Sequence, residues 1–233
     1  MRLSIVIPCY NEEKNIPLIL ERFSECIKSP DVEVVLVNNG STDNSQSVLD
    51  QLLPSYPFAR CVNVPVNQGY GYGILQGLKE SVGDYIGWTH ADMQTDPYDV
   101  IRALKVINTY PDTEIFIKGD RHGRSLFDNF FTIGMSVFET LYLGCFLYEI
   151  NAQPTIFPRS FFKNWQEPPF DFSLDLYALY LAKIHQMQIE RIAVKFPERI
   201  HGSSSWNTSF SAKWKFIKRT VEFSRKLKNR GIK

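Results

Sequence analysis

Apolar stretches of two kinds alternate along the first ninety residues. Residues 3–8 and 32–37 are short, β-branched and apolar, whereas residues 16–27 between them repeat apolar side chains at the spacing of a helix face. The pattern therefore predicts a strand–helix–strand unit. It continues with a helix at 45–53, a strand at 61–64, a helix at 73–81 and a strand at 84–89. Such alternation is typical of an α/β protein with a mostly parallel central sheet and helices on both faces.

The alternation weakens after residue 115. The pattern there predicts a strand at 115–118, a polar loop at 119–125, an apolar helical segment at 130–148, a helix at 174–185 and a strand at 190–196. The segment 130–148 is almost long enough to cross a bilayer. Glu139 near its centre, together with Gly134 and Gly144, argues against a free-standing transmembrane helix.

Composition places the chain among globular proteins. It has 233 residues, of which 44% are hydrophobic and 22% charged, so a sizeable core is available and disorder is not indicated. The cysteines stand apart without a C-x-x-C pair, at Cys9, Cys26, Cys61 and Cys145. Neither a disulfide framework nor a zinc knuckle is therefore indicated. We expect a reducing, cytosolic compartment.

Charge divides the chain into two parts. Residues 213–233 carry nine Lys or Arg and one acid, Glu222, which leaves 17 basic and 24 acidic side chains, a net charge of −7, on residues 1–212. On a helix, the apolar residues of the tail fill one half: Trp214, Phe216, Ile217, Val221, Phe223 and Leu227. Cations fill the other half: Lys215, Lys218, Arg219, Arg225 and Lys226. We therefore expect one domain at 1–212 and a basic amphipathic helix at 213–233.

Two interpretations of this helix stay open. It lies in an anionic membrane surface, which makes the protein peripheral on the cytoplasmic face of the membrane. Alternatively, its apolar half packs on the domain and its charges are only solvated. Nucleic acid is a poorer partner, because the domain is acidic and no recognition motif accompanies the basic stretch.

Polar residues gather where three expected strands end, at 8–12, 38–43 and 90–94. The carboxyl ends of parallel strands meet at one edge of a sheet, so we expect the chemistry there. His90, Asp92 and Gln94 alternate, and in an extended segment their side chains point the same way, toward one cation. An imidazole with two oxygens suits Mn²⁺ better than Mg²⁺. The alternative is a purely structural His90.

A glycine run at 69–73 has two interpretations. Gly69, Gly71 and Gly73 let backbone N–H groups approach a phosphate at a helix start. The spacing is not G-x-G-x-x-G, and the run is not in the first strand–helix turn, so the dinucleotide signal is weak. A tight turn that needs a positive φ is the alternative, and a position beside a ligand stays open.

The three strand-end segments together resemble family 2 glycosyltransferases, which have the GT-A fold. They are Ile5-Val6-Ile7-Pro8-Cys9-Tyr10-Asn11-Glu12, Val37-Asn38-Asn39-Gly40-Ser41-Thr42-Asp43, and Gly83-Asp84-Tyr85 leading into Ala91-Asp92-Met93-Gln94-Thr95-Asp96-Pro97. Within the family, the chain is most similar to dolichol- and polyprenyl-phosphate sugar transferases. The resemblance covers most of residues 3–206. Later, Gly119-Asp120-Arg121 resembles the acceptor-loop arginine motif and Arg199-Ile200-His201-Gly202-Ser203-Ser204 the late arginine loop.

The resemblance implies a role for each matching residue. It implies that Pro8, Tyr10 and Glu12 hold the nucleotide and that Val37 and Asn39 lie beside the base. It also implies that Ala91 and Asp92 lie at the ribose and the diphosphate. Asp92 and Gln94 become metal ligands. Arg121 and Arg199 contact phosphates, which suits planar guanidinium groups that bind anions through two donors.

The chain departs from the family pattern at three places. Asn38 and Asn39 stand where two acids are usual, His90 replaces an Asp, and Ser205 replaces a Lys. An Asn oxygen still accepts a hydrogen bond from uracil N3–H, whereas guanine, with two donors, favours a carboxylate. UDP is therefore the expected nucleotide, CDP is second and GDP is the least favoured.

The resemblance implies transfer of a sugar from a nucleotide sugar to polyprenyl phosphate or to a lipid-linked or cell-surface glycan. Metal and arginines neutralise the leaving diphosphate, with Mn²⁺ favoured over Mg²⁺. A phosphate acceptor needs no base. A hydroxyl acceptor does, and Asp175 is the candidate, its alternative being a solvated or capping helix acid. Another reading is a degenerate family member that binds nucleotide sugar or a membrane partner without turnover.

Overall fold

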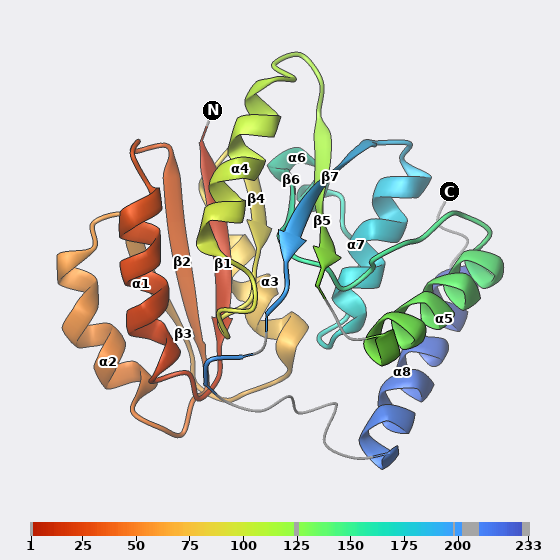
Figure 1. The fold of residues 1–233 in the computed structure, drawn as a ribbon, viewed down its shortest axis with the longest axis horizontal. Coiled ribbons are helices and arrows are strands. Elements are labelled where there is room, and N and C mark those ends of the chain that lie inside the picture. The colour runs from red at the N-terminus through yellow and green to blue at the C-terminus, as the bar shows by residue number, and fades with distance from the viewer. Residues whose placement is uncertain (1, 124–125, 198, 202–209, 230–233) are drawn as a thin grey trace.

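A single sheet organises the computed structural model, which describes residues 2–123, 126–197, 199–201 and 210–229. The described strands are β1 (Leu3–Cys9), β2 (Val32–Asn39), β3 (Ala59–Val64), β4 (Tyr85–Trp88), β5 (Ile115–His122), β6 (Thr155–Pro158) and β7 (Gln188–Lys195). Their order across the sheet is β3-β2-β1-β4-β6-β5-β7 (Figure 1). The pairs β1–β2, β1–β4, β2–β3 and β5–β7 are parallel. Only β6, which pairs with β4 and β5, runs antiparallel within the described sheet.

Helices cover both faces of the sheet, as the alternation of strands and helices predicts. On one face lie α1 (Asn15–Cys26), α2 (Ser45–Leu52) and α4 (Pro97–Asn108), and in Figure 1 these stand in front. On the other face lie α3 (Tyr70–Glu80), α6 (Arg159–Lys163) and α7 (Ser173–Ile184). Neighbouring residues of one strand serve opposite faces. Ile5 packs in the α1 layer and Val6 in the α3 layer, the alternation that strand geometry requires.

Two further helices, α5 (Leu126–Leu143) and α8 (Phe210–Asn229), lie side by side at one end of the sheet (Figure 1). Glu139 of α5 is fully buried and accepts a hydrogen bond of 2.6 Å from Ser224 of α8. Phe223 and Leu227 of α8 are buried in the core that includes α7, whereas Trp214 is 61% exposed. The packing interpretation of the tail is therefore confirmed for Phe223 and Leu227. Within the described ranges, no helix has the length and apolar character to span a membrane.

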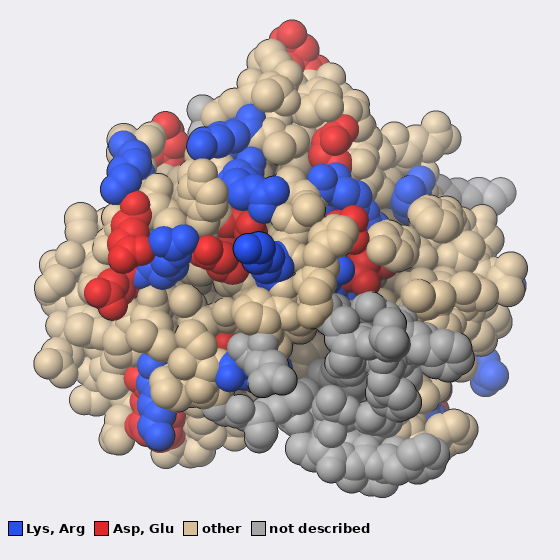
Figure 2. Space-filling model, viewed as in Figure 1, with Lys and Arg blue, Asp and Glu red and all other residues tan. Residues whose placement is uncertain are grey.

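Charged side chains of both signs are interspersed on the face that carries α1 and α4 (Figure 2). Several form ion pairs: Arg22 lies 2.9 Å from Asp96, and Arg102 lies 2.7 Å from Asp99. These pairs are partly exposed, so each contributes at most about 1 kcal/mol to stability. All four cysteines are free, in agreement with the absence of a disulfide pattern.

Several element boundaries differ from the predicted ones. α3 begins at Tyr70, so Gly71 and Gly73 lie inside the helix, and α5 spans 126–143, not 130–148. A polar loop at 119–125 is wrong for 119–122, because β5 continues in parallel register with β7 as far as His122. Residues 124–125 lie outside the described part. The apolar pattern does not predict α4, β6, α6 or the short 3₁₀ turn η1 (Leu53–Ser55).

Candidate functional site

The loops that follow β1 and β2 are joined into one edge of the site. The Asn11 side-chain oxygen accepts a hydrogen bond of 2.8 Å from the Thr42 backbone N–H, and the Glu12 N–H donates to the Ser45 hydroxyl at 2.9 Å. Asn38 Oδ1 accepts from the Ser41 N–H at 3.1 Å. Because β1 and β2 are parallel and in register from end to end, their loops emerge together, as expected. Asn38 thus holds the loop after β2.

Asn39 connects the second loop to the glycine run. Its Nδ2 donates to the Gly69 carbonyl at 3.0 Å, while its Oδ1 is buried and has no partner among the described residues. Gly69 has a φ of +117°, and a Cβ there would lie 2.4 Å from the Phe170 carbonyl oxygen. A Cβ on Gly71 would lie 2.7 Å from the Asp171 carbonyl oxygen. The tight turn is therefore confirmed at Gly69, Gly71 is needed for close packing, and a ligand role for either stays a prediction.

The loop after β4 meets the segment after β7 through one arginine. Arg199 Nε lies 2.9 Å from Asp92 Oδ2 and donates to Gln94 Oε1 at 2.9 Å. Gln94 Nε2 in turn donates to the Pro197 carbonyl at 2.9 Å. The arrowheads of β1 and β4 point toward the lower edge of Figure 1, where the segment after β7 also lies. Two predicted metal ligands and one predicted phosphate contact are thus brought together.

His90 lies among the predicted catalytic side chains. Burial lowers the pKa of its imidazole, while the negative charges of Asp92 and Asp175 act in the opposite direction. The positive charges of Arg121 and Arg199 lower this pKa further. The pKa of this imidazole therefore responds to charges from four separate segments, and its neutral form is favoured.

The side chains gathered here are of the types that bind divalent cations. Asp92 and Gln94 supply oxygens, and a neutral imidazole at His90 is the form that binds metals. No cluster of three or more His, Cys, Asp and Glu with metal-binding geometry is found in the part of the chain that the structure describes. The guanidinium of Arg199 stands between the Asp92 and Gln94 oxygens. Convergence of all three side chains on one cation stays a prediction.

The predicted nucleotide residues lie along the same edge with different exposures. Tyr10 is 46% exposed, whereas Val37 and Ala91 are buried. Pro8 is half-buried at the carboxyl end of β1. Burial raises the pKa of the Glu12 carboxyl, and the charges of Asp92 and Arg199 also act on it, in opposite directions. Glu12 is therefore close to the loop after β4, and the ligand contacts of the whole set stay predictions.

Arg121 is placed differently from the sequence expectation. It belongs to β5, its side chain is only 8% exposed, and its Nε forms an ion pair with Glu149. Its guanidinium also lies over the Phe196 ring, 5.3 Å from the ring centroid. The prediction that Arg121 lies in a polar loop is wrong, because the β5–β7 pairing extends past it. Its phosphate contact stays a prediction.

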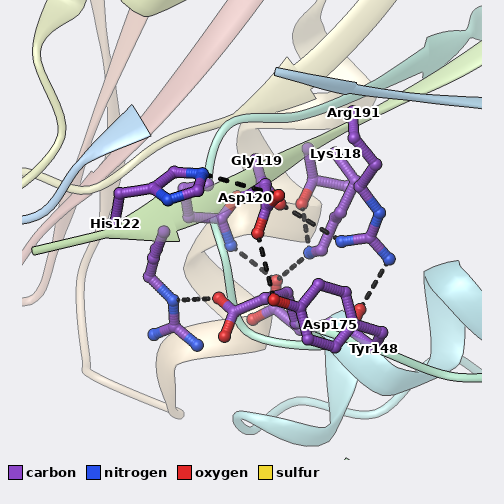
Figure 3. A network of polar contacts seen from close by, with 11 residues as sticks. Lys118, Gly119, Asp120, His122, Tyr148, Asp175 and Arg191 are labelled. Carbon is purple, nitrogen blue, oxygen red and sulfur yellow. Dashed lines mark hydrogen bonds and ion pairs between the residues drawn. The ribbon is translucent and has the colours of Figure 1, made fainter. Parts of the chain in front are cut away.

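Asp175 is part of a buried polar network (Figure 3). It is 2% exposed, so the solvated alternative is wrong. Its Oδ1 accepts from Lys118 Nζ at 3.3 Å and from Gln153 Nε2 at 2.5 Å. Lys118 Nζ also donates to Thr155 Oγ1 at 2.6 Å, and burial lowers the pKa of Lys118 to about 8. These contacts join β5, β6 and α7 beneath the site.

A second group of contacts extends the network outward. Arg191 donates to the carbonyls of Gly119 at 3.2 Å and Tyr148 at 2.6 Å. The Tyr148 hydroxyl donates to Asp120 at 3.3 Å, and Asp120 lies 3.6 Å from the His122 imidazole (Figure 3). β5 therefore carries three ionisable side chains after Gly119, those of Asp120, Arg121 and His122.

The residues that hold the predicted ones in place were not predicted from the sequence. Lys118 had a visible signal, since it is a single cation at the end of the apolar run Ile115 to Ile117. Glu149 and Gln153 lie in a stretch without any pattern, and only the fold brings them to Arg121 and Asp175. Ser205 and residues 202–204 of the late arginine loop lie outside the described residues.

Comparisons with known proteins agree with this arrangement. Residues 4–174 match the sequence model of glycosyl transferase family 2. A segment of 109 residues is 35% identical to undecaprenyl-phosphate 4-deoxy-4-formamido-L-arabinose transferase from Yersinia enterocolitica, covering 45% of this chain and 33% of that protein. A segment of 106 residues is 36% identical to the prophage bactoprenol glucosyl transferase homolog of Escherichia coli K12, covering 45% of this chain and 34% of that protein. The match thus spans about a third of these relatives.

The fold is similar to that of glucosyl-3-phosphoglycerate synthase from Mycobacterium tuberculosis, solved with Mn²⁺, UDP-glucose and phosphoglyceric acid. The TM-score is 0.74 at 18% identity, over 96% of this chain and 79% of that chain. At that identity the likeness establishes the fold, which is GT-A as predicted. The family model covers most of the chain and includes the loops after β1, β2 and β4. The chain therefore belongs to glycosyl transferase family 2.

Proposed function

We propose that this protein transfers a sugar from a UDP-sugar to a polyprenyl phosphate, with a divalent cation, preferably Mn²⁺. The observation that carries the proposal is the meeting of Asp92, Gln94 and Arg199 at the carboxyl edge of the sheet, beside His90. Sugar transfer from a nucleotide needs compensation of the charge that develops on the leaving diphosphate. An acid, an amide oxygen and a guanidinium in one place are suited to hold a diphosphate and its cation.

The nucleotide end of the site supports uridine. Asn39 Oδ1 is a buried acceptor without a partner among the described residues, and such an atom is costly to leave unpaired. Uracil N3–H is a single donor that one amide oxygen satisfies. Tyr10, exposed after β1, offers a ring for stacking, and the charge of Asp92 in the loop after β4 acts on Glu12. Pro8, Val37 and Ala91 complete the proposed nucleotide edge.

Asp92, Gln94 and His90 are the residues that would hold the cation. When bound, the cation supplies Lewis-acid neutralisation of the leaving diphosphate. Arg199 interacts with two of these ligands, and its planar group is able to contact a phosphate through two donors. Arg199 therefore has two tasks in the proposal: it orders the Asp92 loop, and it binds phosphate.

The acceptor side is built around Arg121 and Asp175. Arg121 is held by Glu149, which fixes its guanidinium in one direction, and we assign it to the acceptor phosphate. A phosphate oxygen is already ionised, so that transfer needs no protein base. Asp175 then accepts a hydrogen bond from a hydroxyl of the transferred sugar. With a glycan hydroxyl as the acceptor, Asp175 is the candidate base.

A membrane-facing surface fits a lipid-linked acceptor. On α5, Ile133, Val137 and Leu141 are 54%, 52% and 77% exposed, and their spacing of four places them on one face. Lys228 of α8 lies 4.6 Å from the ring centroid of Tyr142, beside this stripe. Trp214 adds an exposed interfacial aromatic. Apolar residues bordered by cations suit an anionic lipid surface, so we place the α5–α8 pair on the membrane, at the cytoplasmic face.

A thermal-shift series tests the donor side of the proposal. The protein is heated with UDP, CDP or GDP, each with and without Mn²⁺. Preferential binding of a ligand to the native state raises the transition temperature. We expect the largest rise with UDP and Mn²⁺ together, and a smaller one for UDP alone. An equal response to GDP, or no response to any nucleotide, contradicts the UDP assignment. Binding without turnover of any UDP-sugar favours the degenerate-member alternative.

A further inference from the structure

We propose that Lys118 and Gln153 are positioning residues that fix the Asp175 carboxylate in one orientation at the sugar end of the site. The inference rests on the proposed function, because it concerns how Asp175 meets the transferred sugar. It adds two residues to which neither the motifs nor the family comparison gives a role.

The geometry of the network is specific to one oxygen atom. Lys118 Nζ and Gln153 Nε2 both donate to Oδ1 of Asp175, at 3.3 Å and 2.5 Å. Oδ2 has no hydrogen-bond partner among the described residues, so it is the oxygen left to meet a ligand. Lys118 is anchored by Thr155 at 2.6 Å and is fully buried. Lys118 and Gln153 therefore hold one oxygen of the carboxylate and leave the other oxygen available to a ligand.

Stability alone is a weak explanation for this arrangement. A buried ion pair loses the hydration of both charges, and well-packed apolar residues of similar volume often serve as well or better. Lys118 and Asp175 are both almost completely excluded from solvent. The positive charges of Arg191 and Arg121 also act on Lys118 unfavourably. The buried charge of Lys118 is therefore better explained by the orientation that it gives the Asp175 carboxylate.

Other buried polar side chains lie next to the same carboxylate. Burial raises the pKa of the Tyr70 hydroxyl, whereas hydrogen bonding from Trp88 and Gln153 lowers it, so these three side chains are close together. The charge of Asp175 acts on both the Tyr70 hydroxyl and the His90 imidazole, so these groups are its neighbours on the site side. Hydroxyl groups of a bound sugar would add to this polar group beside Asp175.

A double-mutant cycle tests the inference with UDP-glucose, undecaprenyl phosphate and Mn²⁺ as the assay. Lys118→Met removes one of the two donors to Asp175, and Asp175→Asn removes the negative charge that this donor contacts. We expect each single variant to lower kcat by tenfold or more with KM for UDP-glucose changed less than threefold. The double variant should be no slower than the slower single one, because both act through one group. Lys118→Arg, which keeps the charge, should recover part of kcat.

Two further variants separate positioning from folding. Arg60→Met removes an ion pair with Glu33 near the amino end of β2, so it should lower the melting temperature with kcat within threefold of the parent. Gln153→Met removes the second hydrogen bond to Asp175 and should lower kcat. This variant tests the inference even if Lys118→Met does not fold. Parental kcat in either Lys118→Met or Gln153→Met, or multiplicative losses in the double variant, overturns the inference alone. A parent that is inactive with every common UDP-sugar overturns the proposed function and the inference with it.

Discussion

Arg199 Nε lies 2.9 Å from the carboxylate of Asp92, which joins the segment after the last strand to the loop after β4. Asp92 also accepts the Gln94 backbone N–H at 3.1 Å, so the loop is fixed from within and from outside. The two residues that we assign to cation and phosphate are thus one unit. Substitution of either should alter the position of the other.

Replacement of Asp92 by Ala should abolish transfer without unfolding the protein. The change removes the carboxylate best placed to hold the cation and the partner of Arg199, and we expect turnover to fall by about a thousandfold or more. Turnover is measured as UDP release, and folding by the thermal transition. Asp112→Ala, at an exposed acid before β5, is the matched control and should behave as the parent. Near-native turnover of Asp92→Ala excludes the cation assignment.

His90→Asp should move the metal preference from Mn²⁺ toward Mg²⁺. An imidazole favours Mn²⁺, whereas an all-oxygen donor set favours Mg²⁺. The measurement is the ratio of turnover with the two cations at equal concentration, in parent and variant. An unchanged ratio returns His90 to a structural role.

Lys at position 121 or 199 should slow the reaction more than it affects stability. Lysine keeps the charge but loses the two-donor geometry of guanidinium, and Arg121 and Arg199 each use Nε toward a side-chain oxygen. We expect kcat/KM to fall at least tenfold in Arg121→Lys and in Arg199→Lys. Arg22→Lys on α1, which loses a more exposed pair with Asp96, is a control outside the site. Native rates in both site variants would rule out phosphate binding by these arginines.

Glu139 should make stability depend on pH. Burial raises the pKa of its carboxyl to about 7, above its ordinary value. The native state therefore holds a proton that the unfolded chain has released, and stability falls as pH rises from about 4.5 to about 7. In Glu139→Gln this loss should disappear, leaving the variant more stable than the parent at pH 8 by up to about 3 kcal/mol. Urea unfolding at pH 5 and pH 8 measures it, and equal pH dependence in both proteins would contradict the assignment.

The α5–α8 surface should bind anionic vesicles. Leu141→Asp places a charge in the exposed apolar stripe, and replacing Lys215, Lys218, Arg219, Arg225 and Lys226 by Gln removes the attraction to lipid. Both changes should reduce sedimentation with vesicles that contain phosphatidylserine, and higher salt should weaken binding of the parent. The Gln variant should remain folded and act on short water-soluble acceptors. A parent that never sediments with vesicles contradicts the membrane assignment.

The fold followed from the sequence where elements are long and periodic. β1, α1 and β2 carry repeated apolar positions, and their bounds differ from expectation by one or two residues. β6 has only four residues, Thr155–Pro158, and the prolines at 154 and 158 argue against a strand there. α4 does have a start signal, because the Asp96 side chain accepts a hydrogen bond from the Tyr98 N–H at 2.9 Å. The residues around it were interpreted as part of the family motif that ends at Pro97, so no helix was predicted.

The candidate site was predictable only in part, for a physical reason. Residues at strand ends meet because parallel strands share an edge, so Asp92 and Asn39 were placed from sequence alone. Lys118 and Gln153 reach Asp175 only because β6 is inserted antiparallel between β4 and β5. The local pattern of apolar and polar residues does not encode the insertion of β6. The contacts with Asp175 could therefore not be predicted from the sequence.

The most direct test of the account is sugar transfer itself, measured with purified protein, UDP-glucose, Mn²⁺ and undecaprenyl phosphate in anionic vesicles. Product is followed as glucosylated lipid together with released UDP, and the other common UDP-sugars are run in parallel. The account predicts lipid product with at least one UDP-sugar, dependence on the divalent cation, and no product with Asp92→Ala. Tight UDP and Mn²⁺ binding with no lipid product from any UDP-sugar would contradict it.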